Sequence, residues 1–188
     1  AHTLSATLLS SLDHEERNSP SYPFAAREPV EVFYNKASAG ITRDVGRLYG
    51  TISAAAESWD FADTTAMDGS NLDLDPRDQQ LYSTTLRTGY RISPGFELVG
   101  KVKGLKIENK GDEFSDTDAL GYEALAGLAF ETSPLLRWRI LGGFGVRDYE
   151  QAGTPNLAVS LMEAEVQWLP TQRLTIYGSL TRRLNETG

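Results

Sequence analysis

The chain has 188 residues, of which 40% are hydrophobic and none is cysteine, and its formal net charge is −8. This length suits one domain, the missing cysteines exclude disulfides and thiolate metal sites, and the acidic balance argues against a general nucleic-acid binder. No segment approaches the roughly 18 to 20 consecutive apolar residues of a membrane-spanning helix. A membrane β-barrel is compatible with this composition, because only alternate residues of its strands face lipid.

Alternation of apolar and polar residues recurs along the chain and predicts antiparallel β-strands. The clearest case alternates Leu136, Trp138 and Ile140 with Arg137 and Arg139. We expect about nine strands, long enough to cross a bilayer. In chain order they cover residues 2–15, 31–43, 47–61, 82–92, 96–107, 122–130, 136–147, 163–168 and 174–181.

The connections between these strands alternate between tight and long. Tight turns are expected at 44–47, 93–95, 132–135 and 169–173, and long polar connections at 18–30, 62–80, 109–121 and 150–156. Short turns on one side and long loops on the other are typical of outer-membrane barrels. The sequence therefore predicts an all-β fold, an antiparallel transmembrane meander barrel or part of one.

Aromatic residues near the strand ends are the candidates for contact with outer-membrane lipid. Tryptophan and tyrosine are enriched where a barrel wall crosses the membrane–water interface. The predicted interfacial girdle consists of Trp59, Tyr90, Phe96, Phe130, Trp138 and Trp168.

An odd strand number affects how the predicted barrel closes. If the first strand rises from the periplasm, the ninth also rises, so joining them would create a parallel seam. No signal peptide precedes the first predicted strand, which already includes residues 2–5. We expect 1–188 to be one barrel domain from a mature chain, incomplete at one or both ends and completed by further residues or other chains.

Three stretches carry a resemblance to a known family. They are the run from Asp75 through Arg91, ISPGFELVGKVKG at 92–104, and GYEALAGLAFETSPLLRWRILGGFGVRDYE at 121–150. These stretches resemble the putative beta-barrel porin family of Proteobacteria, and the opening HTLSATLLSSLDHEER is similar to an earlier strand of the same kind. Members are larger barrels, often associated with exopolysaccharide production and export. The resemblance covers most of this chain and about half of a typical member, and implies an outer-membrane pore for a polysaccharide in Gram-negative bacteria.

Charged residues on the polar side of the strands form the main candidate site. Folding the hairpins about their turns predicts three opposite-charge pairs across neighbouring strands. They are Arg91 with Glu97, Glu131 with Arg137, and Arg139 with Glu165. The full predicted lumen lattice is Arg87, Arg91, Glu97, Lys101, Lys103, Glu131, Arg137, Arg139, Arg147, Glu163, Glu165 and Tyr177.

Two interpretations of this lattice stay open. The charges can simply satisfy a polar barrel wall, or they can guide a sugar polymer and set pore selectivity. In the second case, Arg87, Lys101, Lys103 and Arg147 form a basic stripe suited to an acidic polysaccharide.

Catalytic and metal chemistry find little support in the sequence. The acidic loop Asp68, Asn71, Asp73, Asp75 and Asp78 offers oxygen ligands for calcium but lacks EF-hand spacing, so a solvated loop is favoured. Two distant histidines without cysteine disfavour zinc, and no cofactor is expected.

Two enzyme hypotheses are also disfavoured. Ser11, Asp13 and His14 follow one another too closely on one strand to converge as a hydrolase triad. Glu163 and Glu165 lie near Arg139, which favours carboxylates, whereas a glycosidase acid must carry a proton. We therefore expect no catalytic residues and no enzymatic activity.

The sequence thus predicts a porin-like component of the bacterial outer membrane, with polysaccharide as its cargo. One alternative is a structural or anchoring subunit of a multi-chain envelope complex that conducts nothing. Another is a soluble β-sandwich binding module.

Overall fold

The computed structural model describes residues 2–15, 26–110, 118–149, 157–171 and 173–183. Nine strands form one antiparallel sheet: β1 (His2–His14), β2 (Glu31–Val45), β3 (Leu48–Phe61), β6 (Gln79–Ser93), β7 (Phe96–Asn109), β8 (Ala119–Ser133), β9 (Leu136–Tyr149), β10 (Leu157–Thr171) and β11 (Leu174–Arg182). Among the described residues, no helix is long and apolar enough to span a membrane.

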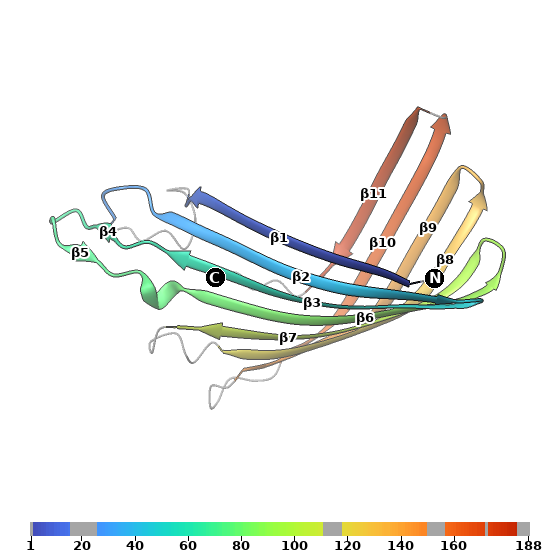
Figure 1. Cartoon of the computed structure of the whole chain (residues 1–188), viewed down its shortest axis with the longest axis horizontal. Coiled ribbons are helices and arrows are strands. Elements are labelled where there is room, and N and C mark those ends of the chain that lie inside the picture. Colours follow the sequence, from blue (N-terminus) through green and yellow to red (C-terminus); the bar gives the residue numbers. More distant parts are fainter. Residues whose placement is uncertain (1, 16–25, 111–117, 150–156, 172, 184–188) are drawn as a thin grey trace.

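Each strand of the sheet pairs with the strands that precede and follow it, in the order β1-β2-β3-β6-β7-β8-β9-β10-β11. The predicted all-β antiparallel meander is therefore present. Within the described residues, β1 and β11 each have only one neighbour, so this sheet is open between them. Figure 1 shows its strong coiling, in which β10 and β11 run at a steep angle to β1 and β2.

Tight turns join the strands at one end of the sheet, where the sequence predicted them. Val45 pairs with Leu48 and Ser93 with Phe96, so two residues suffice for each connection. Gly46 and Gly95 lie in these turns with φ of 63° and 75°, a left-handed conformation that other residues rarely adopt.

The sheet has two unlike faces, because side chains alternate along each strand. Along β2, β6 and β8, more exposed and less exposed side chains alternate from residue to residue. The less exposed side chains lie on the face toward which the sheet curls. We call that face concave and the opposite face convex.

Glycines let the backbones of β8 and β9 approach closely. A Cβ on Gly143 would overlap the carbonyl oxygen of Ala124, and one on Gly127 would overlap that of Ile140. Without these side chains the two backbones approach closely and the sheet can curl. We call the concave face of β7, β8, β9 and β10 the corner. Between β8 and β9, four successive pairs on this face each join a glycine to a larger residue: Gly121 with Arg147, Gly145 with Glu123, Gly143 with Leu125, and Gly127 with Leu141.

The long connection between β3 and β6 is itself structured, a feature that the sequence did not indicate. It contains a short hairpin, β4 (Thr64–Thr65) with β5 (Asn71–Leu72), and the 3-10 turn η1 (Asp75–Arg77). Its Leu74 packs on Val30, which is fully buried, and on Ala26. Arg77 donates two hydrogen bonds to Glu15 just beyond β1, at 2.9 and 3.1 Å. A small core and an ion pair thus fasten this connection to the sheet.

Candidate functional site: the polar concave face

All twelve residues of the predicted lattice lie on the concave face. The strand register places Arg87 beside Lys101, Lys103 beside Glu123, and Glu163 beside Thr181 on this side. The shared face follows from period-two alternation, because each strand contributes every second residue.

The three predicted hairpin pairs are present near the tight turns. Arg91 Nε lies 3.5 Å from Glu97, Arg137 Nε lies 2.8 Å from Glu131, and Arg139 Nη1 lies 2.8 Å from Glu165. The latter two pairs line a hollow of about 520 Å³ on the concave face. Tyr177 joins them there, and its hydroxyl accepts a hydrogen bond from Gln167 at 3.1 Å.

A buried ion pair spans the corner. Lys101 of β7 reaches Glu163 of β10 at 2.5 Å, across the two intervening strands. The two residues are only 9% and 7% exposed. Such a pair contributes little net stability, but removing one partner leaves a buried charge. An apolar cluster on the same face surrounds this bridge: Val99, Leu125, Leu141 and Leu161.

Three of the four residues of the predicted basic stripe, Lys101, Lys103 and Arg147, have acidic neighbours, whereas the register places Arg87 between Thr51 and Lys101. Lys101 is paired with Glu163, and Arg147 lies 3.7 Å from Glu123, whose side chain is also buried. Sequence reasoning missed Glu123, although the alternation of β8 places it on the polar side. The corner is therefore a network of opposite charges rather than a basic surface.

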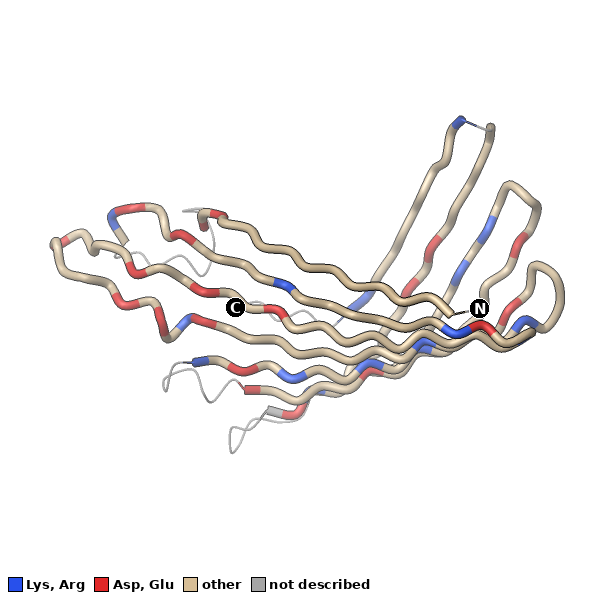
Figure 2. Tube along the Cα trace, viewed as in Figure 1, with Lys and Arg blue, Asp and Glu red and all other residues tan. Residues whose placement is uncertain are grey.

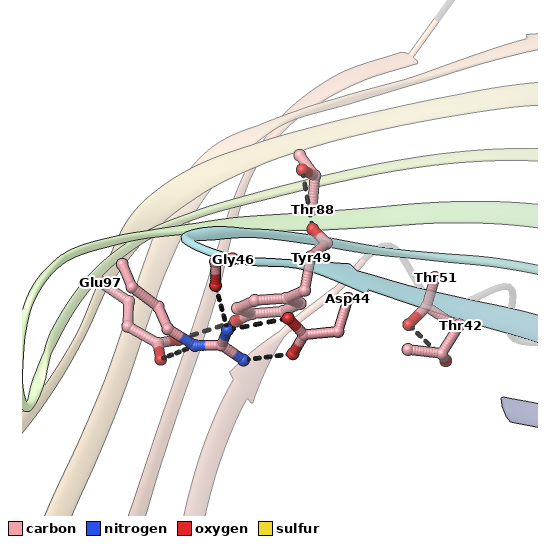
Figure 3. A network of polar contacts seen from close by, with 8 residues as sticks. Thr42, Asp44, Gly46, Tyr49, Thr51, Thr88 and Glu97 are labelled. Atoms are coloured by element: carbon pink, nitrogen blue, oxygen red, sulfur yellow. Dashed lines mark hydrogen bonds and ion pairs between the residues drawn. The ribbon is translucent and has the colours of Figure 1, made fainter. Parts of the chain in front are cut away.

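A second polar network joins two tight turns (Figure 3). Arg91 donates hydrogen bonds to both carboxylate oxygens of Asp44, at 3.1 and 2.7 Å, and to the carbonyl oxygen of Gly46 at 2.9 Å. Tyr49 donates to Glu97 at 2.8 Å. Its ring crosses β6 above Gly89, where a Cβ would overlap it. Asp44 and Tyr49 were not predicted, since their partners lie on strands far along the chain.

The concave face of β2, β3 and β6 differs from the corner because it carries more hydroxyls and fewer charges. Among the described residues, its charges before Asp44 and the turn network are the Lys36–Glu57 pair, at 2.9 Å, and Arg87, which lies beside Thr51. Figure 2 shows few charged positions along the middle of β1, β2 and β3. We define the hydroxyl field as Ser38, Thr42, Thr51, Ser53, Ser83 and Thr85.

Five of the six predicted girdle residues lie on the convex face near the tight turns. Phe96 pairs with Phe130, and Phe130 stacks on Trp138 with ring centroids 6.4 Å apart. Trp168 is 46% exposed on the same face and Tyr90 44%.

Trp59 is a correction to the predicted girdle, because it lies on the concave face. Its ring packs against Tyr34 with centroids 5.1 Å apart. The prediction used closeness to a strand end, whereas the face is set by the alternation. That alternation is obscured in β3 by the run Ala54, Ala55 and Ala56.

The convex face carries a continuous apolar band. Along β6 this band runs from Tyr82 to Ile92, which is about 33 Å of strand and about 25 Å of height at a tilt near 40°. The charged residues of this face lie close to the strand ends: Glu31, Arg43, Asp60, Lys106, Glu108, Asp148 and Arg182.

The acidic loop gathers only part of the predicted calcium ligand set. Asp73 and Asp75 lie with Asp63 in an exposed group whose carboxylate oxygens, all within 4.8 Å of one another, are close enough to share a metal ion. Asp68 instead accepts hydrogen bonds from the backbone and hydroxyl of Ser70. Asp78 is buried and accepts hydrogen bonds from the backbone of Phe61 and from Lys110. These carboxylates therefore organise the connection between β3 and β6.

The candidate triad is also dispersed. Ser11 and Asp13 share the concave face, while the neighbouring His14 points to the convex side, where it lies 3.6 Å from Glu31.

Comparison with known proteins agrees with this geometry. No curated protein and no solved structure matches the chain. A family described as Putative beta-barrel porin 2 matches residues 1–188. The chain therefore belongs to this family of porin-like β-barrel proteins.

Proposed function

We propose that the nine-stranded sheet is part of the wall of a β-barrel in the bacterial outer membrane, and that polysaccharide crosses along its concave face. The observation that carries this proposal is the inverted distribution of polarity. The less exposed, concave face is rich in charges and hydroxyls, whereas the convex face is apolar and exposed. Phe144 and Leu8, for example, are 73% and 85% exposed on the convex side.

This inversion disfavours a soluble sandwich. In a sandwich the covered faces of two sheets are apolar and the outer faces polar. A membrane barrel needs the reverse, because lipid contacts its outer face and water fills its interior. At the strand tilt typical of membrane barrels, the convex band would be about 25 Å tall, which is the height of the apolar band of such barrels.

The proposed role is passive. Among the described residues, the candidate triad is dispersed, the acidic group of Asp63, Asp73 and Asp75 lies in the connection between β3 and β6, and the hydroxyl field offers hydrogen-bonding groups. Such a face suits a hydrated polymer that slides past without chemical change. The unpaired edges of β1 and β11 would be costly in lipid, so we propose that further strands, from this polypeptide or another chain, complete the barrel.

The three tryptophans provide the test, because they lie on opposite faces. We would refold single-tryptophan variants into vesicles whose acyl chains carry bromine, which quenches indole fluorescence on contact. Trp138 and Trp168 should be strongly quenched, while Trp59, on the concave face, should be quenched several-fold less. Equal quenching of all three, or none, would refute the membrane wall. Fractionation of the native cells should place the chain in the outer membrane.

An anchoring subunit is the second candidate, favoured by the filled corner. The Lys101–Glu163 bridge and the apolar cluster occupy the concave face of β7 to β10. Planar-bilayer recording discriminates between the two functions. A pore gives reproducible conductance steps, whereas an anchor inserts with the same tryptophan quenching and passes no current.

A further inference from the structure

We propose that the hydroxyl field and the Tyr34–Trp59 pair bind an uncharged polysaccharide segment, and that the charged corner does not. This inference rests on the proposed function and deepens it. It assigns the ligand to one part of the concave face and selects neutral over acidic sugars.

The first argument is the regular spacing of hydroxyls. The register places Thr42 beside Thr51, Ser53 beside Thr85, and Ser38 one position along the same face. Neighbouring strands lie about 4.8 Å apart, and successive residues of one face about 6.6 Å apart. Thr3, Ser5 and Thr7 continue this pattern on β1. Hydroxyls both donate and accept hydrogen bonds, so such a grid can exchange partners with sugar hydroxyls at many registers.

The second argument is the aromatic pair at the loop end of the field. Tyr34 and Trp59 lie side by side, with ring planes inclined by 40°. Tyr34 donates a hydrogen bond to Glu57 at 2.6 Å, and Glu57 also pairs with Lys36. These contacts hold the tyrosine ring in place. Aromatic rings combine an apolar surface with a polar edge, which suits the C–H face and the hydroxyl rim of a sugar ring.

The third argument is charge. Lys36 and Glu57 neutralise each other beside the aromatic pair, and the six hydroxyl residues carry no charge. Other cations border the field at one edge, where Arg87 lies beside Thr51 and Lys103 beside Thr85. An acidic polymer would instead require clustered guanidinium or ammonium groups. The cations of the corner already face Glu123, Glu163 and Glu165. Away from that edge, on β1, β2 and β3, the hydroxyl field therefore fits a neutral chain better than the corner fits an acidic one.

The test uses the full chain in detergent with Trp59 as its sole tryptophan, in the W138F/W168F background. We would titrate it with maltohexaose, a neutral hexose oligomer, and with hexagalacturonate, an acidic one. The expected result is a saturable shift of Trp59 emission with maltohexaose, and binding at least ten-fold weaker with hexagalacturonate. Tighter binding of the acidic oligomer, or no response to either, would overturn the proposal.

Matched variants separate this site from a general effect of mutation. Thr84 and Thr85 are neighbours on β6 that point to the convex and concave faces, respectively. The T85V/S53A double variant should weaken maltohexaose binding at least five-fold, while T84V should leave it unchanged. Equal losses in both would contradict the assignment.

The outcome also distinguishes this inference from the proposed function. Selective quenching of Trp138 and Trp168 by brominated lipid, without any sugar response, would keep the membrane wall and reject the neutral-sugar track. Sugar binding without selective lipid quenching would keep the binding face and reject the barrel wall.

Discussion

The two halves of the concave face use different means to be polar. The corner encloses charges among apolar side chains and satisfies them with partners across the curve, as Lys101 does with Glu163. The hydroxyl field carries small uncharged groups on a more open part of the sheet. The difference indicates that the corner determines the shape of the sheet, whereas the hydroxyl field is the surface on which we propose that the solute binds.

The largest effect is expected from a methyl group where the backbones of β8 and β9 approach closely. Gly143→Ala would place a Cβ against the carbonyl oxygen of Ala124, which belongs to the backbone and cannot turn away. We expect the free energy of unfolding to fall by at least about 3 kcal/mol, as measured in urea titrations of the detergent-refolded protein. Gly142→Ala is the matched control, because its Cβ meets no atom within 4 Å on the convex face. Similar stability of the two variants would show that glycine does not set the bend.

Breaking the buried ion pair should have the next largest effect. Lys101→Met leaves Glu163 buried, with the exposed Arg183 at 3.7 Å as its remaining cation. We expect the free energy of unfolding to fall by about 3 kcal/mol. The K101M/E163M double variant removes both charges and should recover most of this free energy. A double variant as unstable as K101M would mean that the bridge itself, rather than the orphaned charge, supports the corner.

The hydroxyl field should tolerate substitution much better. Thr51→Val removes a hydroxyl pair with Thr42 at 2.9 Å, on a half-buried part of the sheet. We expect the free energy of unfolding to fall by less than about 1 kcal/mol in the same urea titration. A loss as large as that of Gly143→Ala would contradict the division of the concave face into a shape-determining and a solute-facing half.

The smallest effect concerns pH in the connection between β3 and β6, outside both halves. The Asp73 carboxylate raises the pKa of Asp75 above 3.8, so this loop should lose stability as pH rises through the raised value. Hydrogen bonds from Ser70 lower the pKa of Asp68. The contribution of Asp68 to the stability of the loop is therefore fully present above pH 3.8 and is lost as pH falls through the lowered pKa. In amide exchange near pH 6, D75N should therefore increase loop protection slightly and D68N decrease it. The same sign for both would refute this electrostatic account.

Local pattern predicted most of the strands and their faces. The alternation from Tyr82 to Ile92 continues through the tight turn into β7, so the register and the Arg91–Glu97 pair follow from counting residues. The same logic found Glu131 with Arg137 and Arg139 with Glu165. These contacts join strands that are adjacent both in sequence and in the sheet.

Contacts that depend on the curvature of the sheet could not be predicted from residue alternation along the strands. Lys101 meets Glu163 only because the backbone bends through Gly127 and Gly143, and a flat sheet would keep the two side chains apart. Tyr49 reaches Glu97 for a similar reason, across Gly89. The predicted girdle wrongly included Trp59, because the run of three alanines in β3 hides which residues of that strand share a face. The small core of Ala26, Val30 and Leu74 joins segments separated by a long polar connection, where periodicity carries no signal.

The sequential order of the strands has a consequence for how this wall is built. Every pairing joins consecutive strands of the sheet, so each hairpin can form as soon as its second strand is available, without waiting for distant segments. The bridge from Lys101 to Glu163 needs four strands in place before it can close. This order allows assembly by addition of hairpins along the chain, in which the Lys101–Glu163 bridge can form only after β10 has joined.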